Sequence, residues 1–432
     1  MMNAAGITKE KIRKNVLGSV FLTIFLDLVG FGMFIPVIPL VARRFGASDS
    51  EAVAVASLYS LGTLLAVAIL GRLSDSMGRK KLLLGTVAVS TVAQVLTGLA
   101  QSYPILLAVR FIAGMASGNI SVAQACISDV TTPQERGKSM ALIGIAFGLG
   151  FSLGPAIGAL ISLLFPNESL LGIGIAAAVL NLFNLIVVAR RLPETHHGLA
   201  GPEMRDLITH VKQASESKKD EQITGVWWQD FRHLVQDKGF RIVLLLGFLQ
   251  VFGFIGVESV LSLMLNDAFM ITEQRQQYYA FMYIGFMLVL VNGGLTRPLI
   301  QRMGEVRTLN LGQLLLGITM IALPLVAPSL PLLYLFLFTL AAGSGLSNPS
   351  ISSLTSRLAP NHMQGFALGT SQTLGALARI VGPATFGVLY QSMGGGRSLF
   401  VSAGLMLLGW IVAVLGLQST HKRFMAEKVA GA

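Results

Sequence analysis

The sequence predicts an all-α membrane protein in which twelve transmembrane helices form two pseudo-symmetric bundles of six. Three observations lead to this fold class: an apolar composition, a series of long apolar runs, and an internal repeat. Of the 432 residues, 53% are hydrophobic and only 12% are charged, whereas about 25% of the residues in a soluble domain are charged. The mean hydropathy of +0.69 therefore argues against an ordinary soluble protein.

The apolar runs are each long enough to cross a bilayer as a helix, which takes roughly 20 residues. Their composition, rich in Gly, Ala and Leu, lacks the alternation of a strand, and helices satisfy their own backbone polar groups in lipid. The first run is too long for a signal peptide and contains Asp27, so we expect it to remain as a helix. The predicted spans are 16–42, 51–73, 82–100, 104–128, 138–164, 170–190, 241–265, 277–300, 308–328, 331–354, 366–391 and 397–418.

The net charge of +11 is distributed unevenly along the chain. If the N-terminus is cytoplasmic, nearly all Lys and Arg residues fall in inner segments, which is the positive-inside pattern. We therefore expect both termini in the cytoplasm, a lipid bilayer as partner, and no nucleic-acid partner. The outer loops hold only Arg43, Arg44, Arg275 and Arg397.

The chain contains two homologous halves. The longest polar interval, 192–239, separates six spans from six, so the predicted domains are an N-terminal bundle (1–191), a cytoplasmic linker (192–239) and a C-terminal bundle (240–432). Transporters with two parallel repeats of this kind bind substrate between them near mid-membrane. The matching positions are Gly118 with Gly345, Pro133 with Pro360, and Gly154-Pro155 with Gly382-Pro383.

Four stretches resemble motifs of the major facilitator superfamily. "GRLSDSMGRKK" (71–81) resembles the signature loop between helices 2 and 3, and "RFIAGMASG" (110–118) resembles the helix-4 motif. "GFSLGPAIGA" (150–159) resembles the helix-5 motif of antiporters, and "FLDLVGFGMFIPVIP" (25–39) is similar to helix 1 of twelve-span drug:proton antiporters, tetracycline-efflux proteins in particular. The resemblance implies the major facilitator fold and transport by alternating access.

For function, the resemblance implies a monomeric secondary transporter of the bacterial cytoplasmic (inner) membrane. Its expected partners are a small-molecule substrate and protons: drug-like amphiphiles leave in exchange for protons, as in multidrug efflux and antibiotic resistance. Transport of a specific lipid, siderophore or metabolite is the alternative. Tetracycline pumps carry a further carboxylate in helix 3, whereas 82–100 has Ala93 and Gln94 in that neighbourhood and no acid.

Asp27 and Arg110 are the charged residues that stand out inside spans of the first half. A charge at mid-membrane costs about 2.5–3.5 kcal/mol, so we predict that Asp27 lines the substrate cavity and carries the coupled proton. The alternative is a structural acid bonded to neighbouring helices. Arg110 stays charged when buried, and the resemblance places helices 1 and 4 together in the central cavity. Alternatively, the side chain of Arg110 could extend to the membrane surface and keep its charge in water.

Glu258 in the seventh span and Arg379 in the eleventh are the corresponding residues of the second half. We predict that both line the substrate cavity. Glu258 is the second candidate for proton coupling, because Asp27 and Glu258 are the only carboxylates well inside predicted spans. Glu258 could instead bind a cationic substrate or face the outer vestibule.

The loop 71–81 is predicted to act as a conformational latch. Asp75 is its one acid among four cations. The resemblance places Asp75 against the cytoplasmic start of helix 11 in the other half, and a helix N-terminus attracts an anion. A plain orientation signal with a solvated ion pair is the alternative. The latch residues are Gly71, Asp75, Gly78 and Arg79.

A strip of small residues marks the fifth span. Gly150, Gly154 and Gly158 recur every four residues on one helical face, which permits close approach of another helix backbone. Pro155 removes one helical hydrogen bond and permits a bend. Packing and a hinge are both open interpretations, and the resemblance implies a role in preventing leak.

Other classes of function lack their sequence signals. No phosphate-binding GxxxxGK[ST] loop is present, which disfavours ATP-driven pumping, and neither a His/Cys metal cluster nor a nucleophile elbow stands out. We therefore expect no enzyme activity, no metal and no cofactor. The single cysteine, Cys126, lies within a span, so an intramolecular disulfide is impossible. A sensor that uses a transporter fold is the third class of function.

Overall fold

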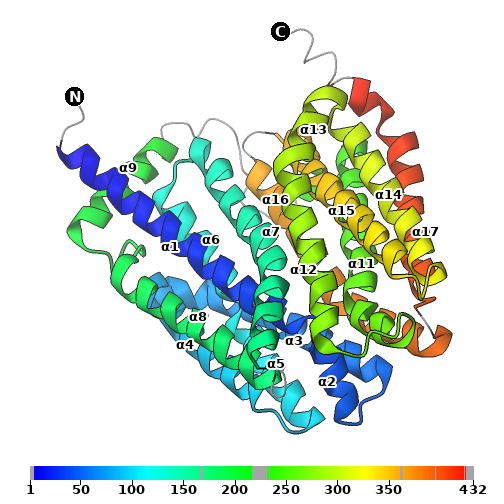
Figure 1. Cartoon of the computed structure of the whole chain (residues 1–432). Coiled ribbons are helices and arrows are strands. Elements are labelled where there is room, and N and C mark those ends of the chain that lie inside the picture. The colour runs from blue at the N-terminus through cyan, green and yellow to red at the C-terminus, as the bar shows by residue number, and fades with distance from the viewer. Residues whose placement is uncertain are drawn as a thin grey trace. The chain divides into compact units, whose positions relative to one another are not determined.

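The computed structural model describes residues 4–165, 169–216, 231–232, 234–360, 363–394, 396–422 and 424. All regular elements within these ranges are helical (Figure 1), and eleven helices are long and apolar enough to span a membrane. The predicted fifth span lies in α7 (Pro133–Leu164), a helix of 32 residues. Its described side chains form an apolar stretch at Leu153–Ser162. The all-α prediction is therefore confirmed for the described part of the chain.

The chain divides into two compact units, which we call unit 1 and unit 2. Unit 1 contains the described residues of 4–34 and 58–216, and unit 2 contains 35–57 and those from 231 onwards. The helices of unit 1 are α1 (Ala4–Phe34), the later part of α3 (Asp49–Met77), α4 (Arg79–Gly98), α5 (Tyr103–Ala116), α6 (Asn119–Val130), α7, α8 (Ser169–Arg191) and α9 (Pro202–Glu216).

Unit 2 follows the second half of the sequence, with one addition from the first half. Residues 35–57 pack with it although the repeat assigns them to the N-terminal bundle. Its helices are α2 (Ile38–Arg44), the start of α3, α11 (Lys238–Asp267), α12 (Gln274–Leu290), a π-helical segment η1 (Val291–Thr296), α13 (Arg297–Met303), α14 (Glu305–Leu325), α15 (Leu330–Leu358), α16 (Gln364–Met393) and α17 (Leu399–Gly416).

Two predicted spans are interrupted. The first, predicted over 16–42, ends as a helix at Phe34 and resumes as α2 at Ile38; Pro36 lacks the N–H that would continue the helical hydrogen bonds. The fourth, predicted over 104–128, breaks at Ser117–Gly118 between α5 and α6. Both breaks lie close to the polar residues described below.

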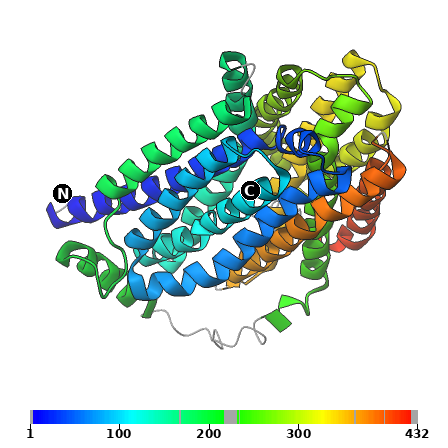
Figure 2. The same ribbon diagram turned by 90° about the horizontal axis from the view of Figure 1, so that it is seen from below.

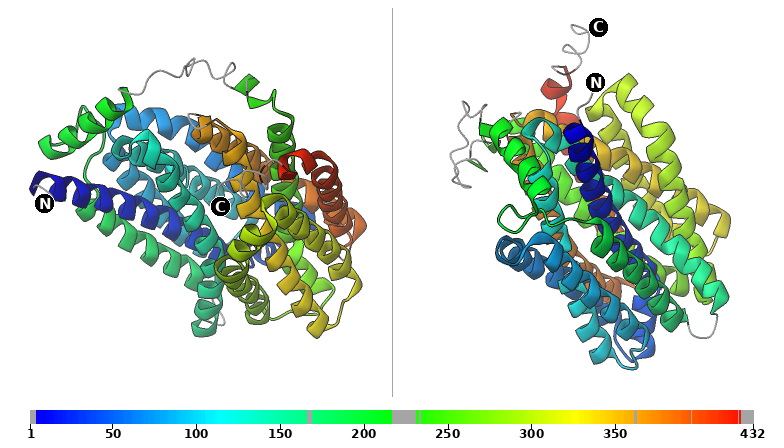
Figure 3. Two further views of the ribbon diagram at one scale, coloured as in Figure 1. Left: turned by 90° about the horizontal axis from the view of Figure 1, so that it is seen from above. Right: turned by 90° about the vertical axis from the view of Figure 1, so that its left-hand side faces the viewer.

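Each unit has its own apolar core. In unit 1, α8 lies alongside α1 (Figure 2), and buried residues of α1, α4, α6, α7, α8 and α9 form one cluster. The short helix α9 lies beside the start of α1 (Figure 3), where Lys9 and Asp206 form an ion pair at 2.7 Å. In unit 2, the corresponding cluster centres on the later part of α11 and includes Val53 from the start of α3.

Candidate functional site

Asp27 lies in a buried polar cluster within unit 1. Its carboxyl group, in the apolar helix α1, accepts a hydrogen bond at 3.5 Å from the Ser90 hydroxyl on α4 and interacts with the hydroxyl of Ser117, which follows α5. Ser90 in turn accepts a hydrogen bond at 3.1 Å from the amide of Asn181 on α8. Asp27 is only 5% exposed. The carboxyl group on α1 thus has hydrogen-bonding partners from α4 and from the α5–α6 break, and α8 supplies a partner of Ser90.

Arg110 lies in the same cluster, on α5. Its guanidinium group stacks between the rings of Phe34 and Tyr59, at 4.9 and 4.8 Å from their centroids. Its charge acts on Asp27, and the Tyr59 hydroxyl is hydrogen-bonded to Ser117, which also contacts Asp27. The structure therefore brings the two predicted residues of the first half into one site.

One atom of this cluster is unsatisfied. Arg110 is 3% exposed, and its Nη1 has no hydrogen-bond acceptor among the described residues. Burying a charged donor without an acceptor is costly, so this N–H group is suited to an anionic or carbonyl oxygen supplied by another molecule.

Glu258 and Arg379 form the corresponding pair in unit 2. Glu258 lies on α11 and Arg379 on α16, both partly buried, and the charge of each acts on the other. The four charged residues predicted for the site thus form two pairs, one in each unit. Their common membership of a single cavity stays a prediction.

Arg79 anchors an ionic network at the end of unit 1 where α1 and α4 begin. Its guanidinium group contacts Asp75 at 2.6 Å and Asp129, near the end of α6, at 3.3 Å. Its side chain is 10% exposed, whereas that of Asp75 is 65% exposed. The contact of Asp75 with helix 11 stays a prediction, while Asp129 is a partner of Arg79 that the sequence did not reveal.

Position 78 requires a glycine for two reasons: its backbone φ is positive, and the carboxylate of Glu194 leaves no room for a side chain. Its φ is +95°, and a Cβ there would stand 2.6 Å from Oε2 of Glu194. That carboxylate accepts the backbone N–H groups of Arg79 and Lys80 at 2.8 and 3.1 Å, as expected for an anion at a helix N-terminus. Glu194, in the segment after α8, therefore fixes the start of α4.

Unit 2 repeats this network with reversed charges. Gly304, with φ of +80°, precedes Glu305 as Gly78 precedes Arg79. Glu305 pairs at 2.7 Å with Arg357, near the end of α15, whereas Arg79 pairs with an acid at the end of α6. The exchange of acid and base at matching positions supports the internal repeat.

Arg79 and Asp75 are expected to differ in their effect on stability. Arg79→Ala leaves the partly buried Asp129 carboxylate without its cation and should lower the free energy of unfolding by about 2 kcal/mol. Asp75→Asn removes only an exposed partner, which is worth about 0–1 kcal/mol. Thermal unfolding of the two purified variants measures the difference. Equal losses of stability would contradict the assignment of Asp129 as the principal partner of Arg79.

The glycine strip of α7 packs against α1. A Cβ on Gly150 would stand 2.5 Å from the Cβ of Leu28, and one on Gly154 would stand 2.7 Å from the carbonyl oxygen of Val29. In unit 2, a Cβ on Gly382 of α16 would meet Ile255 of α11 at 2.7 Å. Close helix packing is therefore present at both matching positions. Pro155 and Gly158 are buried in the same helix, and a hinge or a barrier to leak there stays a prediction.

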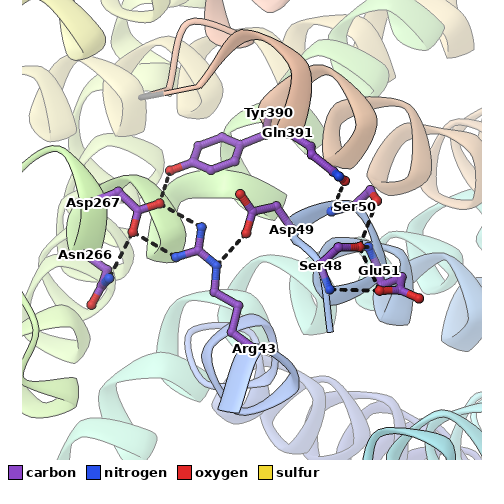
Figure 4. A network of polar contacts seen from close by, with 9 residues as sticks. All are labelled: Arg43, Ser48, Asp49, Ser50, Glu51, Asn266, Asp267, Tyr390 and Gln391. Carbon is purple, nitrogen blue, oxygen red and sulfur yellow. Dashed lines mark hydrogen bonds and ion pairs between the residues drawn. The ribbon is translucent and has the colours of Figure 1, made fainter. Parts of the chain in front are cut away.

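A second network, which we call the Arg43 network, lies within unit 2 (Figure 4). Arg43 donates through Nε to Asp49 at 2.7 Å and through both terminal nitrogens to Asp267 at 2.8 and 2.7 Å. The Tyr390 hydroxyl donates to Asp267 at 2.9 Å. Hydrogen bonding to Asp267 raises the pKa of Arg43 further above its usual range. The network ties 35–57 to α11 and α16; in the sequence, Arg43 counted only as an outer-loop cation.

The described residues contain no group of three His, Cys, Asp or Glu side chains that could hold a metal ion. The polar groups described above are instead carboxylate–guanidinium pairs and hydroxyl or amide groups. These arrangements can bind and release protons and can bind charged or polar organic groups.

Comparison with known proteins gives consistent matches over nearly the whole chain. The family model described as Major Facilitator Superfamily matches residues 20–383 and 243–428. Major facilitator superfamily domain-containing protein 10 of Bos taurus is 27% identical over 430 residues, which cover 91% of each chain. The class G tetracycline resistance protein of Vibrio anguillarum is 27% identical over 399 residues, covering 91% of this chain and 93% of the relative. The crystal structure of the human organic anion transporter MFSD10 (TETRAN) has a TM-score of 0.64 at 25% identity, covering 93% of this chain and 99% of that one.

Proposed function

The chain belongs to the major facilitator superfamily, which confirms the predicted twelve-helix fold, and from this premise we propose that it exports amphiphilic small molecules in exchange for protons. The protein is an integral, multi-pass membrane transporter. The relatives include proteins named for tetracycline and multidrug resistance, which supports efflux of drug-like compounds.

The observation that carries the proposal is the buried cluster around Asp27. A carboxyl group deep in a spanning helix is costly unless it is used, and this one has hydroxyl partners that suit both its ionised and its protonated form. The charge of Arg110 acts on it. Protonation of Asp27 therefore changes the net charge of the cluster, and that change couples proton binding to the conformation of unit 1.

For the substrate, the unsatisfied Nη1 of Arg110 favours a molecule with an anionic group and an aromatic or apolar body. The anion would accept the free N–H group, and the rings of Phe34 and Tyr59 would contact the apolar part. The solved relative named as an organic anion transporter supports this substrate class. A neutral or cationic drug is the competing class, with Glu258 as its contact.

We also propose that both termini are cytoplasmic in a bacterial inner membrane. Cysteines placed in 43–50, 266–275 and 392–394 should then react with an impermeant reagent from outside the cell, whereas cysteines in 192–216 should not. The native Cys126 is buried, so labelling reports the introduced residues. The reverse pattern would contradict the orientation and the direction of transport built on it.

In alternating access, we expect the segment 35–57 to detach from α11 and α16 when the outer side of the transporter opens. The Arg43 network opposes this detachment because it joins the segment to both helices. Arg43→Gln should therefore weaken the docking of this segment by about 1 kcal/mol, or about fivefold in population. The measurement is crosslinking between cysteines that replace Ser50 and Gln391, whose contact at 3.3 Å reports docking.

Arg44→Gln is the matched control, because the Arg44 side chain is exposed and its removal leaves the Arg43 network intact. Crosslinking should fall with Arg43→Gln and stay unchanged with Arg44→Gln. Equal yields in the two variants would show that the network does not hold the segment.

The proposed function is tested directly by reconstitution into lipid vesicles with a panel of organic anions, antibiotics, dyes and lipids. We expect one class of compound to cross the vesicle membrane chemically unchanged and to be enriched against its gradient when a pH gradient is imposed. Chemical alteration of the compound would indicate an enzyme. Binding without movement would indicate a receptor.

A further inference from the structure

A buried row of polar side chains, which we call the polar file, lies where α8 packs against α1 and α4 in unit 1. It extends from Asp27 toward Thr23 and Asn184; on the other side of Asp27, the buried amide of Gln94 on α4 lies next to Gly30 of α1. Each of its members is at most 5% exposed. The polar file consists of Thr23 and Asp27 on α1, Ser90 on α4, and Asn181 and Asn184 on α8.

The polar file has two levels. At the level of Asp27, Asn181 donates to Ser90 at 3.1 Å and Ser90 donates to the carboxyl group at 3.5 Å. One helical turn away, the single hydroxyl proton of Thr23 is shared between the side-chain oxygen of Asn184 at 3.0 Å and the backbone carbonyl oxygen of Ser19 at 2.9 Å. Four residues of helix correspond to about 6 Å, so the two levels are separated by roughly two hydrogen-bond lengths.

The direction of the polar file follows from the helices that carry it. Thr23 lies between Asp27 and the start of α1, and Asn184 lies between Asn181 and the end of α8. The start of α4 and the segment after α8 meet at Glu194, and the start of α1 meets α9 through Lys9. The polar file therefore leads from Asp27 toward the end of unit 1 that carries the Arg79 network.

Asn184 has an unsatisfied donor. Its side chain is fully buried, its oxygen accepts from Thr23, and its Nδ2 has no acceptor among the described residues. A buried amide N–H without a partner is costly. Water is the smallest molecule that can satisfy it, and buried water typically bonds to such groups. The amide of Asn184 is thus placed to bind a water molecule at the second level of the polar file, one helical turn from the Asp27 carboxyl group.

Beyond Thr23 and Asn184 the buried side chains of the three helices are mainly apolar, and Ser19 on α1 and Thr86 on α4 are the polar exceptions before the Arg79 network. The three helices contribute side chains to one buried hydrophobic cluster, which separates the polar file from the Arg79 network. A continuous water chain therefore needs a transient parting of these side chains, which keeps protons from leaking at other times. The residues of this apolar plug are Val16, Val20, Leu82, Leu83, Val188 and Leu192.

We propose that the polar file is the path by which Asp27 exchanges its proton with the end of unit 1 that holds the Arg79 network, separately from the substrate route. The inference rests on the proposed proton coupling at Asp27. In the release step, the O–H bond of the Asp27 carboxyl group breaks, a water between the two levels takes the proton, and that water passes a proton on to water held at Asn184. Ser90 then donates its hydrogen bond to the carboxylate that remains, which stabilises the ionised form.

A purely structural role makes a different prediction. Buried polar groups also hold membrane helices together through hydrogen bonds between the helices. In that case a substitution in the polar file lowers stability and leaves the rate of proton exchange at Asp27 unchanged. The unsatisfied Nδ2 of Asn184 argues against packing alone, because it contributes no bond between helices.

The test follows the protonation of Asp27 by time-resolved infrared spectroscopy of the purified full chain after a pH jump, with the proton itself as the probe. The carboxyl band is assigned by its loss in Asp27→Asn. Asn184→Leu removes the amide while keeping the size of the side chain, and should slow the appearance of the band by about fivefold or more. Asn119→Leu is the matched control, since Asn119 is an equally buried amide of unit 1 outside the polar file.

Thr23→Val provides a second, isosteric variant in case Asn184→Leu does not fold, with Thr97→Val of α4 as its control. Slower exchange in both polar-file variants, at unchanged rates in both controls, supports the path. Equal rates in all folded variants would overturn it while leaving coupling at Asp27 intact. If the Asp27 band does not titrate in the wild-type protein, the proposed function fails instead.

Discussion

Asp27→Asn is expected to reduce transport driven by a pH gradient to background while preserving exchange of substrate for substrate. Asparagine keeps the size of the side chain and can still accept the hydrogen bond from Ser90, but it has no proton to bind or release. Exchange transport needs the conformational change and the binding site, not net proton movement. Measurement of both processes in the same proteoliposomes separates coupling from binding.

Glu258→Gln is the matched control, because it neutralises the partly buried carboxyl group of the corresponding pair in unit 2. Its loss should change substrate affinity or selectivity and leave protons coupled to transport. If Asp27→Asn still moves protons with substrate at the wild-type ratio and Glu258→Gln does not, the proton site lies in unit 2. The assignment to Asp27 would then be wrong.

Arg110→Gln is expected to weaken binding of anionic substrates by about 10- to 100-fold, the equivalent of one hydrogen bond to a charged group. Glutamine removes the cation that lies between Phe34 and Tyr59 but keeps a polar side chain in the cluster. The affinity of neutral substrates should change much less. The measurement is the substrate concentration needed to stabilise the purified protein against heat.

Arg110→Lys supplies the control for charge. Lysine keeps the cation but lacks the planar, forked geometry of the guanidinium group, so it should recover part of the affinity for a monovalent anion. Arg379→Gln, in unit 2, should leave that affinity nearly unchanged. Equal losses for anionic and neutral compounds in Arg110→Gln would indicate a damaged fold rather than a lost anion contact.

The residues that the sequence singled out share one property: each is a charge within an apolar run. Asp27, Arg110, Glu258 and Arg379 stand out because a charge in lipid is expensive. The resemblance then placed helices 1 and 4 together, and the structure places Asp27 with Arg110 and Glu258 with Arg379. The twelve spans could also be predicted from the sequence, because the length and the hydropathy of a run are local properties of the chain.

The uncharged members of the site could not be found in this way. Serine, threonine and asparagine are frequent in spanning helices and give no local signal, so Ser90, Asn181 and Asn184 gain meaning only when α1, α4 and α8 are packed together. Tyr59 is similar: its role depends on Arg110, which is distant in the sequence. A search for polar residues repeated at three- or four-residue spacing, as in Asn181 and Asn184, would have pointed to the polar file.

The packing of 35–57 with unit 2 also escaped the sequence. The internal repeat assigns these residues to the first half, and the repeat reflects common ancestry rather than contacts. What holds the segment is the Arg43 network, in which Asp267 is remote in sequence. The helix of the first predicted span ends at Phe34 instead of continuing to 42. The cause is local, because Pro36 cannot continue the helical hydrogen bonds, and it could have been predicted from the sequence.

The central claim is that substrate export is coupled to protons, and the most direct measurement is the internal pH of proteoliposomes loaded with a transported compound. The wild-type protein is reconstituted at equal pH on both sides, and a trapped pH-sensitive dye is followed as the compound leaves. Proton-coupled export predicts that the interior becomes more acidic in proportion to the amount of compound released. Release of the compound with no change in internal pH would contradict the claim.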